Sequence, residues 1–204
     1  MVSVQQREII SSERIRERVR AAYSAAAADP EAKHPFPVGR SFAESLGYPA
    51  ALLCVLPAMA IDSFTGVSNV AILAETHQGD VVLDLGCGAG LDSLIAAHRV
   101  GRGGKVIGID FSEPMLSRAR AAALELGVQN VSFYNASAER LPLRDGCVDV
   151  VLVNGIFNLN PQREAIFQEL ARVIRLGGCL FAAELVLKEP LPSGTRLTED
   201  DWFA

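Results

Sequence analysis

The feature that most constrains the fold is the segment at residues 81–90, which reads Val-Val-Leu-Asp-Leu-Gly-Cys-Gly-Ala-Gly. Its apolar start predicts a buried strand at residues 81–85, and the alternate glycines predict a turn into a helix at residues 91–98. Such a turn lets the backbone approach a ligand beside a helix N-terminus, although any doubly wound α/β sheet can contain a glycine-rich turn. The segment therefore predicts the first strand–turn–helix unit of such a sheet.

The chain from residue 79 onward repeats this alternation of strand and helix. Further strands are expected at residues 105–109, 131–134, 148–153 and 179–187, and further helices at residues 113–126 and 163–175. Ser112 and Asn160 are typical helix N-caps, and Gly177 is typical of the position just beyond a helix end. The apolar run at residues 150–153 favours a parallel strand covered on both faces. We therefore expect a doubly wound, Rossmann-like and mostly parallel α/β sheet.

The first 76 residues have a different pattern, which is helical and interrupted by prolines. Apolar side chains recur with helical spacing at Ile15, Val19, Ala22, Tyr23 and Ala26. This stripe predicts an amphipathic helix that ends at Asp29-Pro30, and a second short helix is expected from Pro49. We expect two units, an N-terminal helical cap or lid at residues 1–76 and a core at residues 77–204.

Composition excludes several classes of protein. The chain has 204 residues, 50% of them hydrophobic, and a net charge of −5, which suits one folded core and disfavours a nucleic-acid partner. Its four cysteines lie more than 30 residues apart, so they predict reduced thiols of a cytoplasmic protein and no metal site: Cys54, Cys87, Cys147 and Cys179. The apolar stretch at residues 49–60 is broken by Pro57, and no membrane span is expected.

The spacing of the glycines discriminates between ligands. A dinucleotide fingerprint requires a glycine at position 91, where this chain has Leu91, so a nucleotide-dependent oxidoreductase is disfavoured. The pattern is instead D-x-G-x-G-x-G, formed by Asp84, Gly86, Gly88 and Gly90. A carboxylate at this position would repel a pyrophosphate. It suits a ligand with a cationic head, such as an amino acid ammonium group or a sulfonium.

A second acid, Asp110, ends the next expected strand, 26 residues after Asp84. An acid at that position in a doubly wound fold accepts hydrogen bonds from ribose hydroxyls, although an aspartate at a strand end is often only a helix cap. Together with the glycines, the two acids indicate a nucleoside-containing ligand with a positive charge.

The stretch at residues 79–184 resembles the class I S-adenosylmethionine-dependent methyltransferases. The resemblance implies strand order 3-2-1-4-5, S-adenosylmethionine as the cofactor, and a set of contacts to it. In that set Gly86, Cys87, Gly88 and Gly90 wrap the methionine part, Asp84 lies near its ammonium group, Asp110 binds the ribose, Phe111 packs on the adenine, Ser137 and Ala138 hold the adenine edge, Asn154 contributes its backbone, and Tyr23 closes from the lid. The family usually has an aspartate where this chain has Ser137, and Tyr23 could instead pack on the core.

Within that family, the segments at residues 45–49, 81–95, 106–120 and 149–161 resemble arsenite methyltransferases. Arsenic chemistry requires soft thiolate ligands, and the cysteines of that subfamily are missing here, for example where this chain has Gly155. Arsenite is therefore disfavoured as the substrate. Methylation of a nucleic-acid amine is disfavoured as well, because the segment after the fourth strand reads Asn-Gly-Ile-Phe rather than the N/D-P-P-Y/F of those enzymes.

The residues that face the acceptor are poorly determined by sequence. His34 could act as a base or be a surface histidine, Phe157 and Asn158 could line the pocket, and Glu139 could be a base or an ion-pair partner. We name no catalytic residue. The predicted function is methyl transfer to a small molecule, and the alternative is a protein that binds the cofactor without turnover.

The resemblance also bears on the end of the chain. A complete member of the family has seven strands, and this chain stops about 17 residues after its fifth expected strand, so we expect the last two to be missing from the sequence. An exposed fifth strand would be an apolar sheet edge. We expect that the sequence is truncated or that a partner, such as a second copy of the chain, covers this edge.

Overall fold

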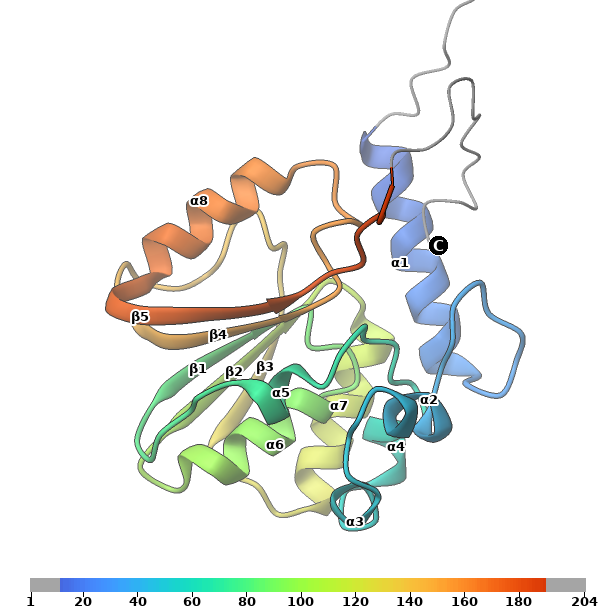
Figure 1. Cartoon of the computed structure of the whole chain (residues 1–204), viewed down its shortest axis with the longest axis horizontal. Coiled ribbons are helices and arrows are strands. Elements are labelled where there is room, and N and C mark those ends of the chain that lie inside the picture. Colours follow the sequence, from blue (N-terminus) through green and yellow to red (C-terminus); the bar gives the residue numbers. More distant parts are fainter. Residues whose placement is uncertain (1–11, 190–204) are drawn as a thin grey trace, which may run out of the picture.

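The computed structural model describes residues 12–189 and contains one parallel sheet with the order β3-β2-β1-β4-β5 (Figure 1). Its strands are β1 Val81–Leu85, β2 Lys105–Asp110, β3 Val131–Asn135, β4 Val148–Asn154 and β5 Ile174–Ala183. Three helices connect them, α6 Leu91–Val100, α7 Glu113–Glu125 and α8 Arg163–Val173. The expected doubly wound fold and its strand order are confirmed.

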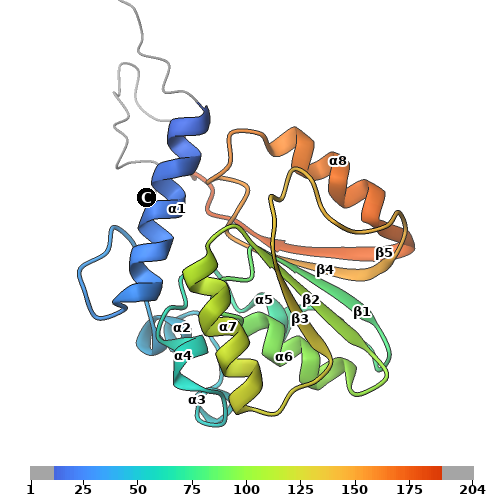
Figure 2. The ribbon, with the colours of Figure 1, turned by 180° about the vertical axis from the view of Figure 1, so that it is seen from behind.

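Five helices precede the sheet in the described part of the chain. They are α1 Ser12–Ala28, α2 Arg40–Ser45, α3 Ala50–Leu53, α4 Ala58–Ile61 and α5 Val70–Leu73. The expected amphipathic helix is α1, which buries Val19, Ala26 and Ala27 and ends just before Asp29. It lies beside the carboxyl ends of the strands in both views (Figures 1 and 2). The N-terminal region thus adds a wall at the sheet edge where ligands bind in doubly wound folds.

The core has two layers because successive strand residues point to opposite faces of the sheet. One face packs against α8, and its strand residues include Leu83, Ile107 and Val151. The other face packs against α5 and α6 with the intervening residues, which include Val82, Val106 and Val150. The apolar runs of β1 and β4 are therefore buried from both sides (Figures 1 and 2).

The last helix and the last strand differ from the expectation. Helix α8 ends at Val173, and β5 begins at Ile174 and ends at Ala183, not at residues 179–187. Gly177 does not cap a helix but lies inside β5 with a φ of 78°, where the register with β4 shifts. The residues between 175 and 179, for which the sequence pattern predicts a loop, form this β-bulge within β5. Asn160 accepts a hydrogen bond from the backbone of Gln162, which itself precedes α8, so Asn160 is not the N-cap.

Strand β5 forms an exposed edge of the sheet as the structure describes it. Leu176 on the bulge is 98% exposed, and Cys179, the first residue of the strand expected at residues 179–187, is exposed as well. The described residues contain five strands. No helix between residues 12 and 189 has both the length and the apolar character that a membrane crossing requires.

Gly108 in β2 allows the sheet to pack under the glycine turn. A Cβ at this position would lie 2.5 Å from Phe133 and 3.0 Å from the Cys87 sulfur. We expect Gly108→Ala to lower the free energy of unfolding by about 1–3 kcal/mol through overpacking, measured by urea denaturation. The control is Gly103→Ala, because a Cβ there would meet only a backbone atom 4.0 Å away. Equal stability of the two variants would contradict this packing argument.

Candidate functional site

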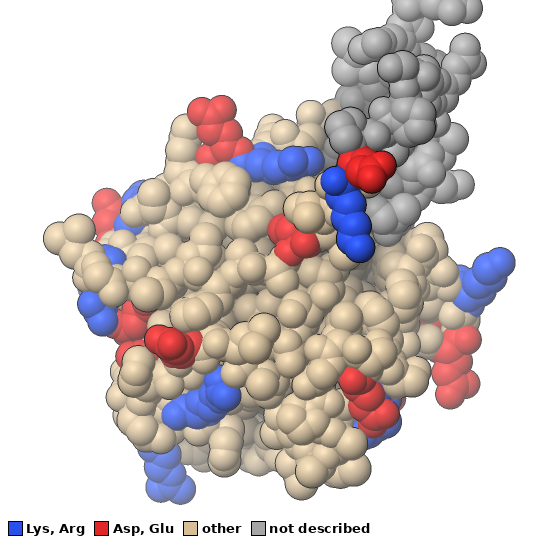
Figure 3. Space-filling model, in the orientation of Figure 1, with Lys and Arg blue, Asp and Glu red and all other residues tan. Residues whose placement is uncertain are grey.

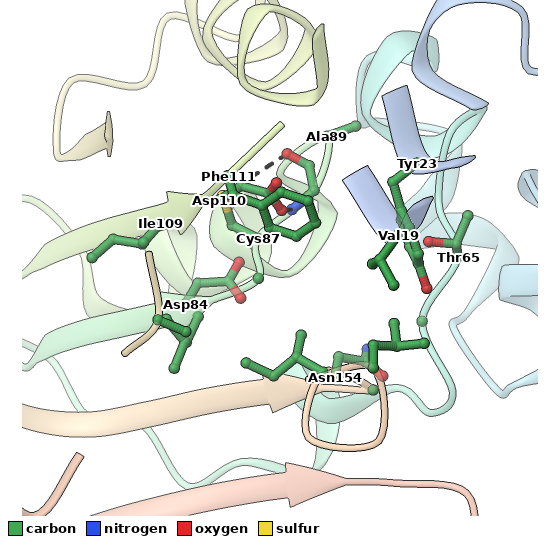
Figure 4. A pocket seen from close by; sticks show the side chains of 18 of the residues that line it. Val19, Tyr23, Thr65, Asp84, Cys87, Ala89, Ile109, Asp110, Phe111 and Asn154 are labelled. Atoms are coloured by element: carbon green, nitrogen blue, oxygen red, sulfur yellow. Dashed lines mark hydrogen bonds between the residues drawn. The ribbon is translucent and has the colours of Figure 1, made fainter. Parts of the chain in front are cut away.

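A cavity of about 120 Å³ lies at the carboxyl ends of β1, β2 and β4. We call residues 86–90 the glycine turn. The sheet side of the cavity is lined by Asp84, Asp110 and residues 86–89 of this turn. The opposite side is lined by α1 and by the segment that precedes α5. In Figure 4, Tyr23 and Thr65 lie across the cavity from Asp84. The pocket therefore lies between the sheet and the N-terminal region.

Register and side-chain parity bring three polar residues together. In the sheet, Asp84 pairs with Gly108 of β2 and with Leu152 of β4. Asp110 and Asn154 lie two residues beyond these partners, so all three side chains point to the same face of the sheet. Each also ends its strand or lies one residue from the end. A neighbouring pair of acids and an amide consequently converge at one edge.

The glycine turn is held against β2 by backbone hydrogen bonds. The N–H groups of Gly86 and Cys87 both donate to the Ile109 carbonyl, at 2.8 and 3.0 Å, and the N–H of Gly88 donates to Asp110 Oδ2 at 2.9 Å. A Cβ at Gly88 would meet no atom within 4 Å, so the backbone there faces open space in the pocket. Gly86, Cys87 and Gly88 line the cavity.

Gly90 does not line the cavity. A Cβ on this residue would lie 3.0 Å from Ala119 and 3.2 Å from Phe133, so the missing side chain lets the turn pack against α7 and β3. The structure thus places Gly90 outside the residues that line the cavity.

Two buried carboxylates sit side by side without a cation. Asp84 is 2% exposed and accepts a hydrogen bond from the Ser93 hydroxyl, and Asp92 is 6% exposed. Burial raises the pKa of Asp84 above its ordinary value, and the negative charge of Asp92 raises it further. Burial also raises the pKa of Asp92. No ion pair among the described residues involves either group, so neither carboxyl has a cationic partner in the protein when it ionises.

Asp110 adds a third buried carboxylate. Its two oxygens accept hydrogen bonds from the backbone N–H groups of Gly88 and Ser112, at 2.9 and 2.8 Å. Burial raises its pKa, and these hydrogen bonds lower it only in part. Each carboxylate oxygen has a further lone pair, so Asp110 can accept two more hydrogen bonds, for example from a vicinal diol.

Aromatic side chains close the pocket beside Asp110. The guanidinium of Arg20 lies 5.6 Å from the centre of the Phe111 ring. Tyr23 comes from α1 and contacts Phe36 with a ring distance of 4.7 Å. Burial raises the pKa of the Tyr23 phenol, Asp110 raises it further, and an interaction with Thr65 lowers it in part. The Tyr23 phenol therefore stays neutral and can exchange hydrogen bonds inside the cavity (Figure 4).

The loop after β3 forms another wall, through Ser137, Ala138 and Glu139. The Ser137 hydroxyl accepts a hydrogen bond from Arg16 at 3.1 Å and donates to Glu139. Burial raises the pKa of Glu139, but the hydrogen bonds from Ser137 and Asn160 and the charge of Arg16 bring it below its ordinary value. Glu139 is therefore an ionised partner of Arg16, and this ion pair ties α1 to the core.

Three residues considered for the acceptor side lie away from the pocket. The His34 ring bonds the Asp29 carbonyl, Phe157 is buried and stacks on Phe167, and Asn158 bonds the chain after β5. Of the four cysteines, Cys87 alone lines this cavity, and burial raises the pKa of its thiol well above its usual value. The described residues contain no cluster of His, Cys, Asp and Glu that could hold a metal ion.

Sequence reasoning missed Asp92 and Tyr48. Asp92 lines the pocket from the first turn of α6, where an acid is ordinarily an exposed residue that favours the helix N-terminus. Tyr48 lies in the N-terminal region and donates to Asp92. No local pattern marks either residue as buried and polar.

Comparison with known proteins shows a consistent family. A model of the methyltransferase domain matches residues 76–203. The arsenite methyltransferase of Halobacterium salinarum is 36% identical over 160 residues, which cover 78% of this chain and 41% of that protein. The demethylmenaquinone methyltransferase of Lactococcus lactis is 37% identical over 103 residues, covering 50% of this chain and 41% of that protein. This chain thus spans about two fifths of the length of these relatives.

Solved structures agree with this. A SAM-dependent methyltransferase from Aquifex aeolicus has a TM-score of 0.52 and 30% identity, covering 59% of this chain and 64% of that one. An arsenic(III) S-adenosylmethionine methyltransferase from Chlamydomonas reinhardtii has a TM-score of 0.58 and 27% identity, covering 84% of this chain and 51% of that one. The second alignment extends into the N-terminal region, since the core alone is shorter than the stretch it covers.

The raised pKa of Asp84 predicts that the stability of the fold depends on pH. A carboxyl whose pKa is raised in the folded state stabilises the fold while protonated, and this contribution is lost as the pH rises from about 4 through the raised value. Asp84→Asn removes the titration. We expect the free energy of unfolding of the variant, minus that of the wild type, to increase between about pH 5 and pH 8 by up to about 1.4 kcal/mol per unit.

Urea denaturation across this range measures the difference. The control is Asp145→Asn, which removes a carboxylate on a side chain that is 81% exposed. Parallel stability curves for Asp84→Asn and the wild type would show that Asp84 does not titrate in this way.

Proposed function

The chain belongs to the methyltransferase-domain family, and from this premise we propose that it transfers the methyl group of S-adenosylmethionine to a small-molecule acceptor. The observation that carries the proposal is the buried, uncompensated carboxylate of Asp84 beside the open glycine turn. Because the matched stretches cover about two fifths of these relatives, the activity is assigned here to the chain's own pocket and not transferred from them.

The residues present fit this cofactor. S-adenosylmethionine carries an ammonium group and a sulfonium, a ribose diol and a flat adenine ring. Asp84 would offset the positive charge, the free lone pairs of Asp110 would accept the diol, and the backbone at Gly88 faces open space that a side chain would fill. Phe111 offers a ring face on the same side of the pocket. Placing a cation here would relieve the repulsion between Asp84 and Asp92.

When bound, the cofactor supplies a methyl group on a good leaving group, so the protein need not provide a nucleophile. The chain's own residues bind, orient and exclude water. Tyr23 and Thr65 close the side opposite Asp84, and the Arg16–Glu139 ion pair holds α1 over the site. We assign no general base, because Glu139 is ionised within that ion pair and no histidine lines the pocket.

We propose an uncharged or thiol-bearing small molecule as the acceptor. Helix α1 lines one side of the cavity, and the three buried carboxyl groups, which lack a cationic partner, disfavour an anion. On the face drawn in Figure 3, basic and acidic side chains are interspersed without a basic stripe, which offers no track for a nucleic-acid backbone. Arsenite is not favoured, because Cys87 is the one cysteine among the lining residues and its thiol is held protonated.

Binding tests the cofactor assignment. We expect S-adenosylhomocysteine to bind the wild type and Asp110→Ala to lower its affinity at least about tenfold, because hydrogen bonds to a charged group contribute roughly 1.5–3 kcal/mol. Isothermal titration calorimetry measures this. NAD⁺ serves as the control ligand and Asp145→Ala as the control variant. If the wild type does not bind S-adenosylhomocysteine saturably, the cofactor assignment fails.

Turnover tests the acceptor. We expect S-adenosylhomocysteine to form from S-adenosylmethionine with at least one neutral or thiol-bearing acceptor in a panel of small thiols, phenols and quinols. Arsenite with glutathione should give no more product than the reaction without acceptor. Tight cofactor binding with no turnover across the panel would instead favour a protein that binds the cofactor without catalysis.

A further inference from the structure

At the wall of the pocket, Asp92 and Asn154 form a hydrogen-bond network with Tyr48, which is buried and does not line the cavity. The Tyr48 hydroxyl donates to Asp92 Oδ1 at 2.6 Å, and Asn154 Nδ2 donates to Asp92 Oδ2 at 2.9 Å. The backbone N–H of Ala71 also points at Asp92, at 3.4 Å. All three neighbours are donors. A carboxylate accepts from all of them at once, whereas an amide of the same size would turn its own N–H₂ toward one.

Asn154 also forms hydrogen bonds with the backbone of the segment at residues 63–69, which we call the wall segment. Asn154 Oδ1 accepts from the N–H groups of Val67 and Ser68, at 2.8 and 3.1 Å. Asn154 Nδ2 donates to the Ser68 carbonyl at 2.7 Å. Donors face its oxygen and acceptors face its nitrogen, so the surroundings define one orientation of the amide.

The wall segment lies directly against this amide. A Cβ at Gly66 would be 2.6 Å from Asn154 Nδ2 and 2.6 Å from the Phe64 ring. The segment then enters the pocket with Phe64, Thr65 and Gly66. Its position in the cavity is therefore determined by Asn154, whose position is determined in turn by Asp92.

We propose that Tyr48, Asp92 and Asn154 are positioning residues, which hold the wall segment in place as the acceptor-side wall of the pocket. The proposal rests on the proposed function, because the cofactor's place at the glycine turn is what makes the opposite wall the acceptor side. Thr65 of the wall segment lies across the cavity from Asp84, next to Tyr23 (Figure 4). Misplacing that wall would misalign an acceptor without removing any contact of the cofactor with Asp84 or Asp110.

A purely structural role makes a different prediction. The Asp92 charge is buried without a cation, so exchanging it for a neutral amide does not remove a net stabilising charge. If Asp92 only supported the fold, its replacement would change stability and wall position together. If it positions the wall segment, the wall loosens while the sheet stays intact.

Amide hydrogen exchange of the full chain, followed by NMR, tests this. We expect the amides of Val67 and Ser68 to exchange at least about tenfold faster in Asp92→Asn and in the milder Tyr48→Phe, because a hydrogen bond to a charged group is lost. The amides of β1 should keep their wild-type rates. The matched control is Tyr134→Phe, which removes the hydroxyl of a tyrosine that is 45% exposed.

The functional readout separates this inference from the proposed function. With the acceptor found in the panel, we expect Tyr48→Phe, whose side chain does not line the cavity, to lower kcat or raise KM for the acceptor at least about tenfold, while the Kd for S-adenosylhomocysteine changes less than about twofold. Unchanged exchange at Val67 and Ser68, or equal acceleration in β1, overturns the positioning role. Absence of S-adenosylhomocysteine binding by the wild type overturns the proposed function and leaves the exchange result intact.

Discussion

The structure depends on burying negative charge at the carboxyl edge of a parallel sheet. The register of β1, β2 and β4 places Asp84, Asp110 and Asn154 on one face of that edge, and α6 adds Asp92 from the same side. Hydroxyl and backbone donors surround these carboxylates, yet no cation among the described residues pairs with Asp84, Asp92 or Asp110. Hydrogen bonds reduce the cost of burying a carboxylate without cancelling its charge. The edge is thus complementary to a cationic ligand before any ligand arrives.

The free-energy cost of burying these carboxyl groups is offset by apolar packing in the rest of the core. Both faces of the sheet are packed with apolar side chains, from Leu83 and Val151 on one side to Val82 and Leu152 on the other. Such packing can tolerate a locally unfavourable site because the apolar area it removes from water is large. The raised pKa of Asp84 is the visible sign of that cost. A more stable site with neutral side chains would lose the charge that recognises a cation.

The features that could be predicted from the sequence are those that depend on residues close together in the chain. The glycine turn, Asp84 and Asp110 are marked by strand ends and short spacing, so the sequence predicted their convergence, although Gly90 packs against α7 instead of facing the cavity. The bulge at Gly177 was missed because a glycine after a helix favours a helix end equally well. Tyr48 and Asn154 meet across 106 positions of the chain, and no periodicity encodes a contact of that separation.

The N-terminal region shares apolar clusters with the core and is also joined to the carboxyl ends of the strands by polar contacts. Arg16 pairs with Glu139, Ser24 with Ser112, and Asn154 with the backbone of Val67 and Ser68. Directional bonds of this kind specify where a segment sits more narrowly than apolar packing does, because each requires a partner at one distance and angle. A family core that binds one cofactor can then present different walls to different acceptors. The relatives matched here, named for arsenite and for demethylmenaquinone, share the core with this chain. We therefore expect the residues that select the acceptor of this chain among the side chains of α1 and the wall segment, and not in the glycine turn.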